Sequence, residues 1–158
     1  MNAQKILLTV ILFASVSIAN AQQELGIRFG DAIGGNAAVD GLVSISKYSR
    51  VHVNVSFGNG IGADALYDFM FRPFGDGTLY WYTGIGPSVR FDDPFLLGVA
   101  GELGLSYMFK NVPISISGDW RPTFMIIENT NFEAGWFGVN VRYVFGKRGG
   151  SDSSGQTK

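Results

Sequence analysis

The chain has 158 residues, of which 46% are hydrophobic and 16% charged, with a formal net charge of −1 and no cysteine. That length is enough for one domain. The near-neutral charge offers no basic face, so no nucleic-acid partner is expected. The absence of cysteine excludes a small exported domain held together by disulfides. Stability must therefore come from packing and closed hydrogen bonding.

The first residues have the pattern of an export leader. Lys5 is followed by an apolar run at residues 6–18, which is too short to span a bilayer comfortably as a helix. Ala19-Asn20-Ala21 then supplies the small-x-small pattern of a cleavage site. We predict a signal peptide over residues 1–21, cut before Gln22. The alternative is an uncleaved anchor or a buried N-terminal helix.

After the leader, apolar and polar residues alternate with period two, and turn residues recur roughly every dozen positions. The pattern predicts eight strands, at residues 24–30, 37–46, 50–57, 62–72, 78–91, 95–109, 114–126 and 134–147. The alternation is cleanest at 50–57, where Val51, Val53 and Val55 alternate with His52 and Asn54. An all-β domain over residues 22–145 is therefore expected.

Two prolines and the turns refine this pattern. Pro87 and Pro122 lie inside the fifth and seventh predicted strands, where a proline removes a ladder donor. We predict a bulge or a local end of pairing at each.

Turns are expected at 47–49, 73–77 and 110–113 on one side, and short loops at 31–36, 58–61, 92–94 and 127–131 on the other. Loops this short offer less surface than receptors and adhesins generally need.

The two faces of the predicted strands differ in polarity. One face is apolar on every strand, and an apolar exterior is unfavourable in water but required in lipid. We therefore predict an eight-stranded antiparallel up-and-down transmembrane β-barrel. Its expected interfacial or lipid-facing aromatic residues are Tyr67, Phe69, Phe71, Trp81, Tyr107, Phe109, Trp120, Phe137, Tyr143 and Phe145.

The opposite face gathers arginines, carboxylates, serines and glycines. An eight-stranded barrel has an interior just wide enough for side chains to fill it. Unpaired charges there would be unfavourable, so the arginines and carboxylates should pair and plug the lumen. The predicted network consists of Arg28, Asp40, Asp64, Asp68, Arg72, Arg90, Glu102, Asp119, Arg121 and Arg142.

His52 is the only histidine and lies on this polar face. A hydrolase hypothesis would use His52 as the base, one of Ser44, Ser46 or Ser56 as the nucleophile and an aspartate to orient the base. The simpler interpretation is a hydrogen-bonded lumen histidine, since serine is common on polar barrel linings. With one histidine, no cysteine and carboxylates matched by arginines, we expect no catalytic residue, metal or cofactor.

Three features carry a resemblance to a known family: the end of the leader, the alternating strands over residues 24–145, and the aromatic end of the last strand at Tyr143 and Phe145. With these features the chain resembles small eight-stranded outer-membrane β-barrel proteins of Gram-negative bacteria, of the outer-membrane protein A/X or porin-family type. The resemblance implies an outer-membrane location with both termini in the periplasm, contact with outer-membrane lipid and insertion by the barrel assembly machinery. The chain departs from many members of this family because residues 146–158, a polar tail that we predict to be disordered, follow Phe145.

The expected function is a non-enzymatic, plugged barrel with a structural or partner-binding role in the envelope, alone or in a larger outer-membrane complex. One alternative is a small pore for small solutes. Another is a lipid A-modifying hydrolase that uses His52. A soluble lipocalin-like carrier would require the two faces to be exchanged.

Overall fold

The computed structural model describes residues 22–75, 77–127 and 130–146, so the predicted leader and the tail beyond Gly146 lie outside the described residues. The regular structure of the described part is entirely β. Its strands are β1 (Gln23–Ala32), β2 (Gly35–Ser44), β3 (Arg50–Phe57), β4 (Ile61–Phe74), β5 (Leu79–Arg90), β6 (Leu96–Met108), β7 (Ile114–Trp120), β8 (Thr123–Ile127), β9 (Asn131–Glu133) and β10 (Phe137–Phe145). No helix among these residues is long and apolar enough to cross a membrane.

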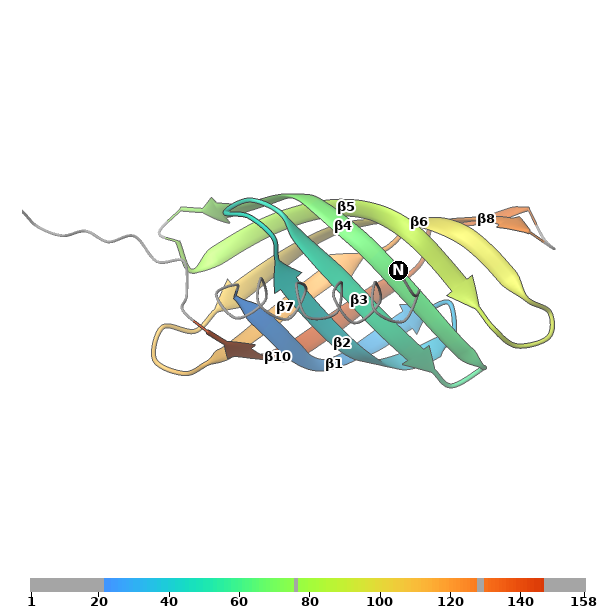
Figure 1. Cartoon of the computed structure of the whole chain (residues 1–158), viewed down its shortest axis with the longest axis horizontal. Helices are drawn as coiled ribbons and strands as arrows, with labels where there is room; N and C mark the ends of the chain where they lie inside the picture. Colours follow the sequence, from blue (N-terminus) through green and yellow to red (C-terminus); the bar gives the residue numbers. More distant parts are fainter. Residues whose placement is uncertain (1–21, 76, 128–129, 147–158) are drawn as a thin grey trace, which may run out of the picture.

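Strands β1 to β7 pair with their neighbours in sequence order, and β10 lies between β7 and β1. Every one of these pairings is antiparallel. The sheet therefore closes on itself as an eight-stranded up-and-down barrel (Figure 1), which confirms the predicted fold class. Closure satisfies the backbone groups that an open sheet leaves unpaired at its edges.

The period-two pattern explains why these segments form wall strands. Along β10, exposed and buried residues alternate without a break from Phe137 to Phe145. In β3, the residues with the parity of His52 are buried and the valines between them are exposed or half-exposed. Successive side chains of a strand point to opposite faces, so each wall strand sends one set of residues outward and the other inward.

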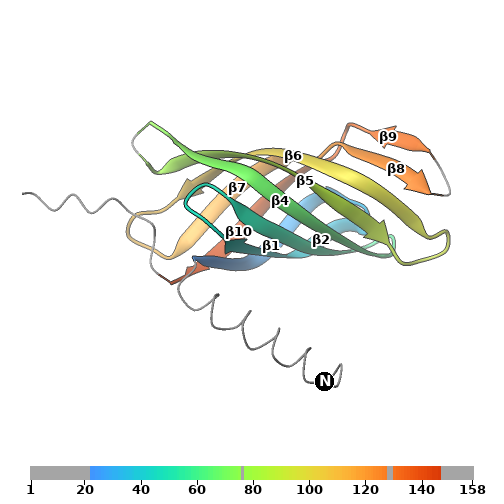
Figure 2. The same ribbon diagram turned by 45° about the horizontal axis from the view of Figure 1, so that its top comes forward.

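The two ends of the barrel differ. At the terminal end lie Gln22, Phe145 and the connections β2–β3, β4–β5 and β6–β7, where turns were predicted. At the loop end lie the connections β1–β2, β3–β4 and β5–β6, together with a hairpin of β8 and β9. Figure 2 shows this hairpin extending from the barrel at the end away from the start of β1.

The predicted seventh strand, 114–126, is two strands. β7 pairs with β6 and β10 as far as Trp120, Arg121 and Pro122 belong to neither strand, and β8 then pairs with β6 and β9. The interruption is local, because Arg121 N–H donates to the Trp136 carbonyl, Gly101 N–H donates to the Pro122 carbonyl, and β8 keeps the register of β7 on β6. Pro122 has no N–H to donate, in agreement with the interruption predicted there. At Pro87, β5 continues and Pro87 pairs with Val99 of β6, whereas the pairing with β4 skips Pro87 and Gly86, so the interruption predicted there occurs on one side only. The three-residue β9 was not predicted.

The register of β4 against β5 shifts between Asp68 and Met70. An extra residue in one strand of an antiparallel pair forms a bulge and inverts the direction of the residues that follow it. Beyond the bulge, Phe71 pairs with the buried Tyr82, and Arg72 pairs with Trp81. The sequence pattern had placed Phe71 on the outer face and Arg72 in the lumen. Both assignments were wrong, and the bulge is the physical reason.

The polarity of the interior is the reverse of that of a water-soluble core. Among the described residues, 19 buried residues are polar or charged and 10 are apolar. The long apolar side chains of the wall, such as Phe29, Leu105 and Val139, are about half exposed. The structure thus has an ionic centre and an apolar outer surface.

Candidate functional site

The buried polar side chains meet inside the barrel and form one cluster of neighbouring polar groups, which we call the lumen network. We define it as Arg28, Asp40, Arg50, His52, Asn54, Asp64, Asp68, Glu102, Ser117, Asp119, Arg121, Asn140 and Arg142. Each of these residues is at most 4% exposed. They come from most of the wall strands, so the network links positions far apart in the sequence.

Among the described residues, Arg121 is the cation with the most carboxylate partners. Its Nη2 lies 2.8 Å from Glu102 Oε2 and 3.9 Å from Asp119 Oδ2, and its Nη1 lies 3.3 Å from Asp64 Oδ2. Nη1 also donates to Asn54 Oδ1 at 2.5 Å. Arg121 continues the inward parity of Ser117 and Asp119, which directs its guanidinium into the lumen. One arginine thus contacts three carboxylates from three different strands.

Arg142 holds a second group of partners. Its Nε donates to Asp40 Oδ2, and its Nη1 donates to Ser117 Oγ at 2.8 Å. The other oxygen of Asp40, Oδ1, lies 2.5 Å from His52 Nε2 and also accepts from Asn54 Nδ2. Asp40 therefore has both oxygens engaged and joins Arg142 to His52.

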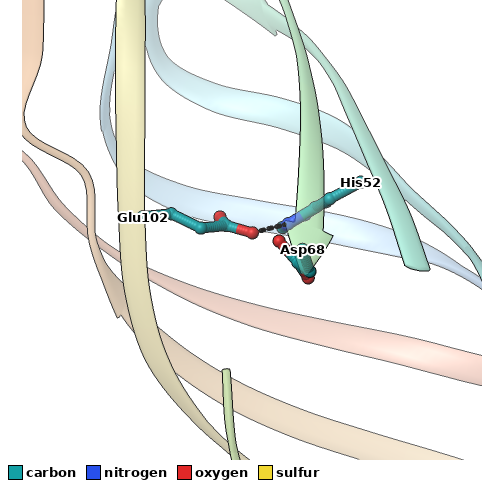
Figure 3. Close-up of side chains that lie close together, drawn as sticks. All are labelled: His52, Asp68 and Glu102. Carbon is teal, nitrogen blue, oxygen red and sulfur yellow. Dashed lines mark hydrogen bonds and ion pairs between the residues drawn. The ribbon is translucent and has the colours of Figure 1, made fainter. Parts of the chain in front are cut away.

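His52, Asp68 and Glu102 face one another near the middle of the lumen (Figure 3). His52 Nδ1 lies 2.8 Å from Glu102 Oε1, while its Nε2 faces Asp40. Both ring nitrogens therefore face carboxylates. Asp68 comes from β4, is fully buried and receives a hydrogen bond from Arg50 Nε at 2.6 Å.

Arg50 closes the network toward the terminal end. Its guanidinium carbon lies 4.3 Å from the ring centroids of both Phe71 and Tyr82. Phe71 also stacks on Tyr80, with centroids 4.6 Å apart. These contacts follow from the β4 bulge, which turns Phe71 inward. The cation lies against aromatic faces that attract it, with Asp68 as its anion.

Arg28 and Asp119 form the pair nearest the loop end. Arg28 Nη2 lies 2.8 Å from Asp119 Oδ1, and Arg28 Nη1 donates to the carbonyl of Asp31 at 2.8 Å. Asn140 donates to Asp119 Oδ2 at 2.6 Å. Gly138 leaves room for this pair, because a Cβ at that position would overlap the guanidinium of Arg28.

The structure brings eight of the ten predicted network residues into ion pairs: Arg28, Asp40, Asp64, Asp68, Glu102, Asp119, Arg121 and Arg142. It leaves out Arg72 and Arg90, which corrects that part of the prediction. The bulge turns Arg72 outward, where its guanidinium lies 4.2 Å from the Tyr48 ring centroid. Arg90 is the last residue of β5 and donates to the carbonyl of Pro94 at 3.4 Å.

Sequence reasoning missed Arg50 as a network member. The signal was available, because Arg50 has the parity of His52 and Asn54 in the most regular strand of the chain. Its partner Asp68 was predicted to be an interior residue, and the two face each other in the register of the neighbouring strands β3 and β4.

The geometry does not assemble the serine hydrolase arrangement considered from the sequence. Among the described contacts, the ring nitrogens of His52 meet Asp40, Glu102, Asn54 and Arg142, and no serine. Ser56 Oγ accepts a hydrogen bond from the backbone of Gly34, and Ser46 Oγ pairs with Ser49 in an exposed turn. Ser44 is only half-buried, at the end of β2.

Most of the predicted lipid-facing aromatic residues lie on the outer surface. The exposed ones are Tyr67, Phe69, Tyr107, Trp120, Phe137, Tyr143 and Phe145. Trp81 and Phe109 are half-buried, and Phe71 points into the lumen. At the terminal end, Tyr107 packs edge-on against Phe109 and Tyr143 against Phe145, with centroids 4.9 and 4.8 Å apart.

No protein-family model, no curated protein and no solved structure matches this chain. The class of the protein therefore follows from its own geometry. It is a closed, eight-stranded, antiparallel up-and-down β-barrel. Buried charged pairs fill its interior.

Proposed function

We propose that this chain is an integral outer-membrane β-barrel protein with a plugged lumen and a non-enzymatic role, structural or partner-binding, in the envelope. The observation that carries the proposal is the inverted polarity of the wall. Large apolar residues such as Phe29, Leu105 and Val139 are 52–57% exposed around the outside, whereas the charged residues of the lumen network are buried. An apolar outer band around a polar interior is the arrangement that a bilayer requires of a barrel.

The dimensions of the wall support the same proposal. A strand that crosses a bilayer at a tilt needs about 9–11 residues. β1 and β2 have 10 residues each and β10 has 9, while β4 and β6 have 14 and 13. The longer strands would project beyond the lipid. The aromatic pairs at the terminal end have the position of an interfacial girdle.

The expected leader and the aromatic last strand support export and insertion by the barrel assembly machinery. Gln22 and Phe145 lie at the same end of the barrel, as periplasmic termini would. The contacts of Arg121 with Asp64 and of Arg142 with Asp40 join strands that are not neighbours, which supports a closed interior over the alternative of a small pore. The hydrolase alternative has less support, because both nitrogens of His52 face carboxylates.

The location can be tested with single cysteines, because the natural chain contains none. A fluorescent label on Val141→Cys, at the middle of the outer face of β10, should be quenched by nitroxides deep in the lipid chains. A label on Ile45→Cys, at the terminal rim, should be quenched by nitroxides at the headgroups. A chain that folds without detergent or lipid, or a Val141→Cys label quenched fully by aqueous iodide, would contradict the proposal.

Conductance tests the plugged lumen separately. The purified barrel in planar bilayers should show no steady openings, because buried ion pairs occupy its cross-section. Steady large openings of the unaltered protein would favour the pore alternative and leave the membrane location intact.

Lipid A from cells with and without the protein, compared by mass spectrometry, should be identical. A change that His52→Ala abolishes would favour the hydrolase.

A further inference from the structure

We infer that the centre of the lumen is a binding site for one divalent transition-metal ion, with His52, Asp68 and Glu102 as its protein ligands. The three residues come from β3, β4 and β6 and converge from different parts of the wall (Figure 3). One potential ligand atom from each lies within 4.8 Å of the others. This inference concerns the interior and does not depend on the proposed membrane location.

The distances are close to those of a metal site. Bonds from zinc to imidazole nitrogen or carboxylate oxygen are about 2.0–2.2 Å long, which places neighbouring ligand atoms roughly 3 Å apart. His52 Nδ1 and Glu102 Oε1 are already 2.8 Å apart. A small shift of Asp68 toward this pair would complete three ligands on one side of an ion.

The remaining atoms of the three ligands have fixed partners. His52 Nε2 lies 2.5 Å from Asp40 Oδ1, Glu102 Oε2 lies 2.8 Å from Arg121, and Asp68 Oδ2 lies 2.6 Å from Arg50. A metal-binding histidine usually donates its second ring N–H to a carboxylate, which fixes the tautomer and the ring orientation. Asp40 is in that position, so Nδ1 is the nitrogen left for the ion.

The carboxylate of Asp68 gives a second observation that points to a bound cation. It is fully buried, yet no N–H or O–H donor among the described residues serves its Oδ1, and the Glu102 carboxylate is its neighbour in the cluster. Gly84 pairs with Asp68 on one side and with Glu102 on the other, and a Cβ on Gly84 would overlap Asp68 Oδ1. The missing side chain at Gly84 therefore makes room for the Asp68 carboxylate. A buried carboxylate oxygen without a donor is unfavourable unless a proton or a metal ion satisfies it.

The charge of the interior points to a cation. Among the described residues, the buried arginines are Arg28, Arg50, Arg121 and Arg142, and the buried carboxylates are Glu24, Asp40, Asp64, Asp68, Glu102 and Asp119. With a neutral imidazole, these four cations against six anions leave an excess of two negative charges. One divalent ion would balance this excess. Alternatively, two protons would balance the excess. One would make His52 an imidazolium between Asp40 and Glu102, and the other would be shared by Asp68 and Glu102.

The ligand set indicates the kind of ion. Calcium and magnesium prefer sites made of oxygen alone, whereas an imidazole with two carboxylates suits zinc, manganese or iron. Zinc is the probe for the test because it takes histidine and carboxylate ligands without redox chemistry. Because the site is enclosed, we expect the ion to enter while the barrel folds.

The test refolds the full chain from urea into detergent micelles with either zinc or EDTA, followed by gel filtration and elemental analysis. We expect stoichiometric zinc in the folded protein and a higher urea midpoint than with EDTA. Asp68→Asn and Glu102→Gln should lose the bound zinc and the midpoint shift. Asp119→Asn is the matched control, because it alters another buried carboxylate. This variant should keep the bound zinc and the shift of the urea midpoint.

Three results would overturn the inference. They are folded protein without zinc, a midpoint that zinc does not move, and zinc content that is unchanged in Asp68→Asn and Glu102→Gln. The first two would assign the balancing charge to protons, and the third would place the zinc elsewhere. If the variants do not fold, the visible absorption spectrum of the unaltered protein refolded with Co²⁺ tests whether the site binds a metal ion. Bands of protein-bound cobalt support the site, and their absence overturns it.

Discussion

Arg121 in the centre of the lumen and Arg72 at the terminal rim carry the same guanidinium group in opposite surroundings. Arg121 is 1% exposed and contacts three carboxylates and an amide, whereas Arg72 is exposed and lies over the ring of Tyr48. A buried cation has lost its water and depends on its partners, while a surface cation keeps its water and gains little from a neighbour. The same residue type should therefore matter very differently at the two sites.

Removing Arg121 should have the largest effect. Arg121→Met keeps much of the side-chain volume but leaves Glu102, Asp64 and Asp119 without a shared cation. Removing one partner of a buried ion pair typically destabilises by about 3–5 kcal/mol. Urea unfolding of the barrel in lipid or detergent, compared with Arg72→Met, measures the difference. Equal midpoints for the two variants would show that the lumen is hydrated.

A charge placed on the outer wall should have the next largest effect. Val141 lies in the middle of β10 and is 40% exposed. If lipid surrounds it, Val141→Arg should destabilise the barrel by about 2–4 kcal/mol, and Ile45→Arg at the rim by about 0–1 kcal/mol. Unfolding in lipid vesicles measures both. If water surrounds the wall, the two substitutions should have similar, small effects.

The Arg28–Asp119 pair should be less sensitive than Arg121. In Asp119→Asn, Arg28 still donates to the carbonyl of Asp31, and the new amide can still accept from Asn140. We expect a loss of about 1–3 kcal/mol in the free energy of unfolding, typical of losing a charged hydrogen-bond partner. Asp64→Asn, which alters a longer contact to Arg121, gives a second reference. A loss for Asp119→Asn as large as that for Arg121→Met would contradict this ranking.

Arg72→Ala should have the smallest effect. Its contact with Tyr48 is an exposed cation–π interaction, worth about 0.5–1 kcal/mol at such sites. The urea midpoint should therefore move little. Arg50→Ala is the internal contrast, because Arg50 also lies over aromatic rings but is buried beside Asp68. If Arg72→Ala were as damaging as Arg50→Ala, burial would not explain the difference between the arginines.

Much of the fold could be predicted because strand parity is a local property. In β3 and β10 the alternation is unbroken, so His52, Asn140 and Arg142 could be assigned to the interior from their positions alone. The interruption at Pro122 was predicted from a local cause, the missing ladder donor of proline. The same cause did not end the strand at Pro87, where β5 continues. These assignments need no knowledge of neighbouring strands.

The face of Phe71 and Arg72 could not be predicted in this way. The bulge that turns them lies between Asp68 and Met70 and has no proline or glycine to mark it. It depends on the register of β4 against β5, which is a property of two strands. The aromatic contacts of Arg50 follow from the bulge, so they were also hidden from the sequence.

By itself, the sequence determined an all-β chain with one apolar and one charged face, because side chains alternate along any strand. Only the tertiary structure decided which charges meet. Arg142 reaches Asp40, Arg28 reaches Asp119 and His52 reaches Glu102 because closure of the sheet brings strands far apart in sequence around one narrow axis. Parity is fixed by each residue's own backbone, whereas pairing across a lumen is fixed by the closure and register of the whole barrel.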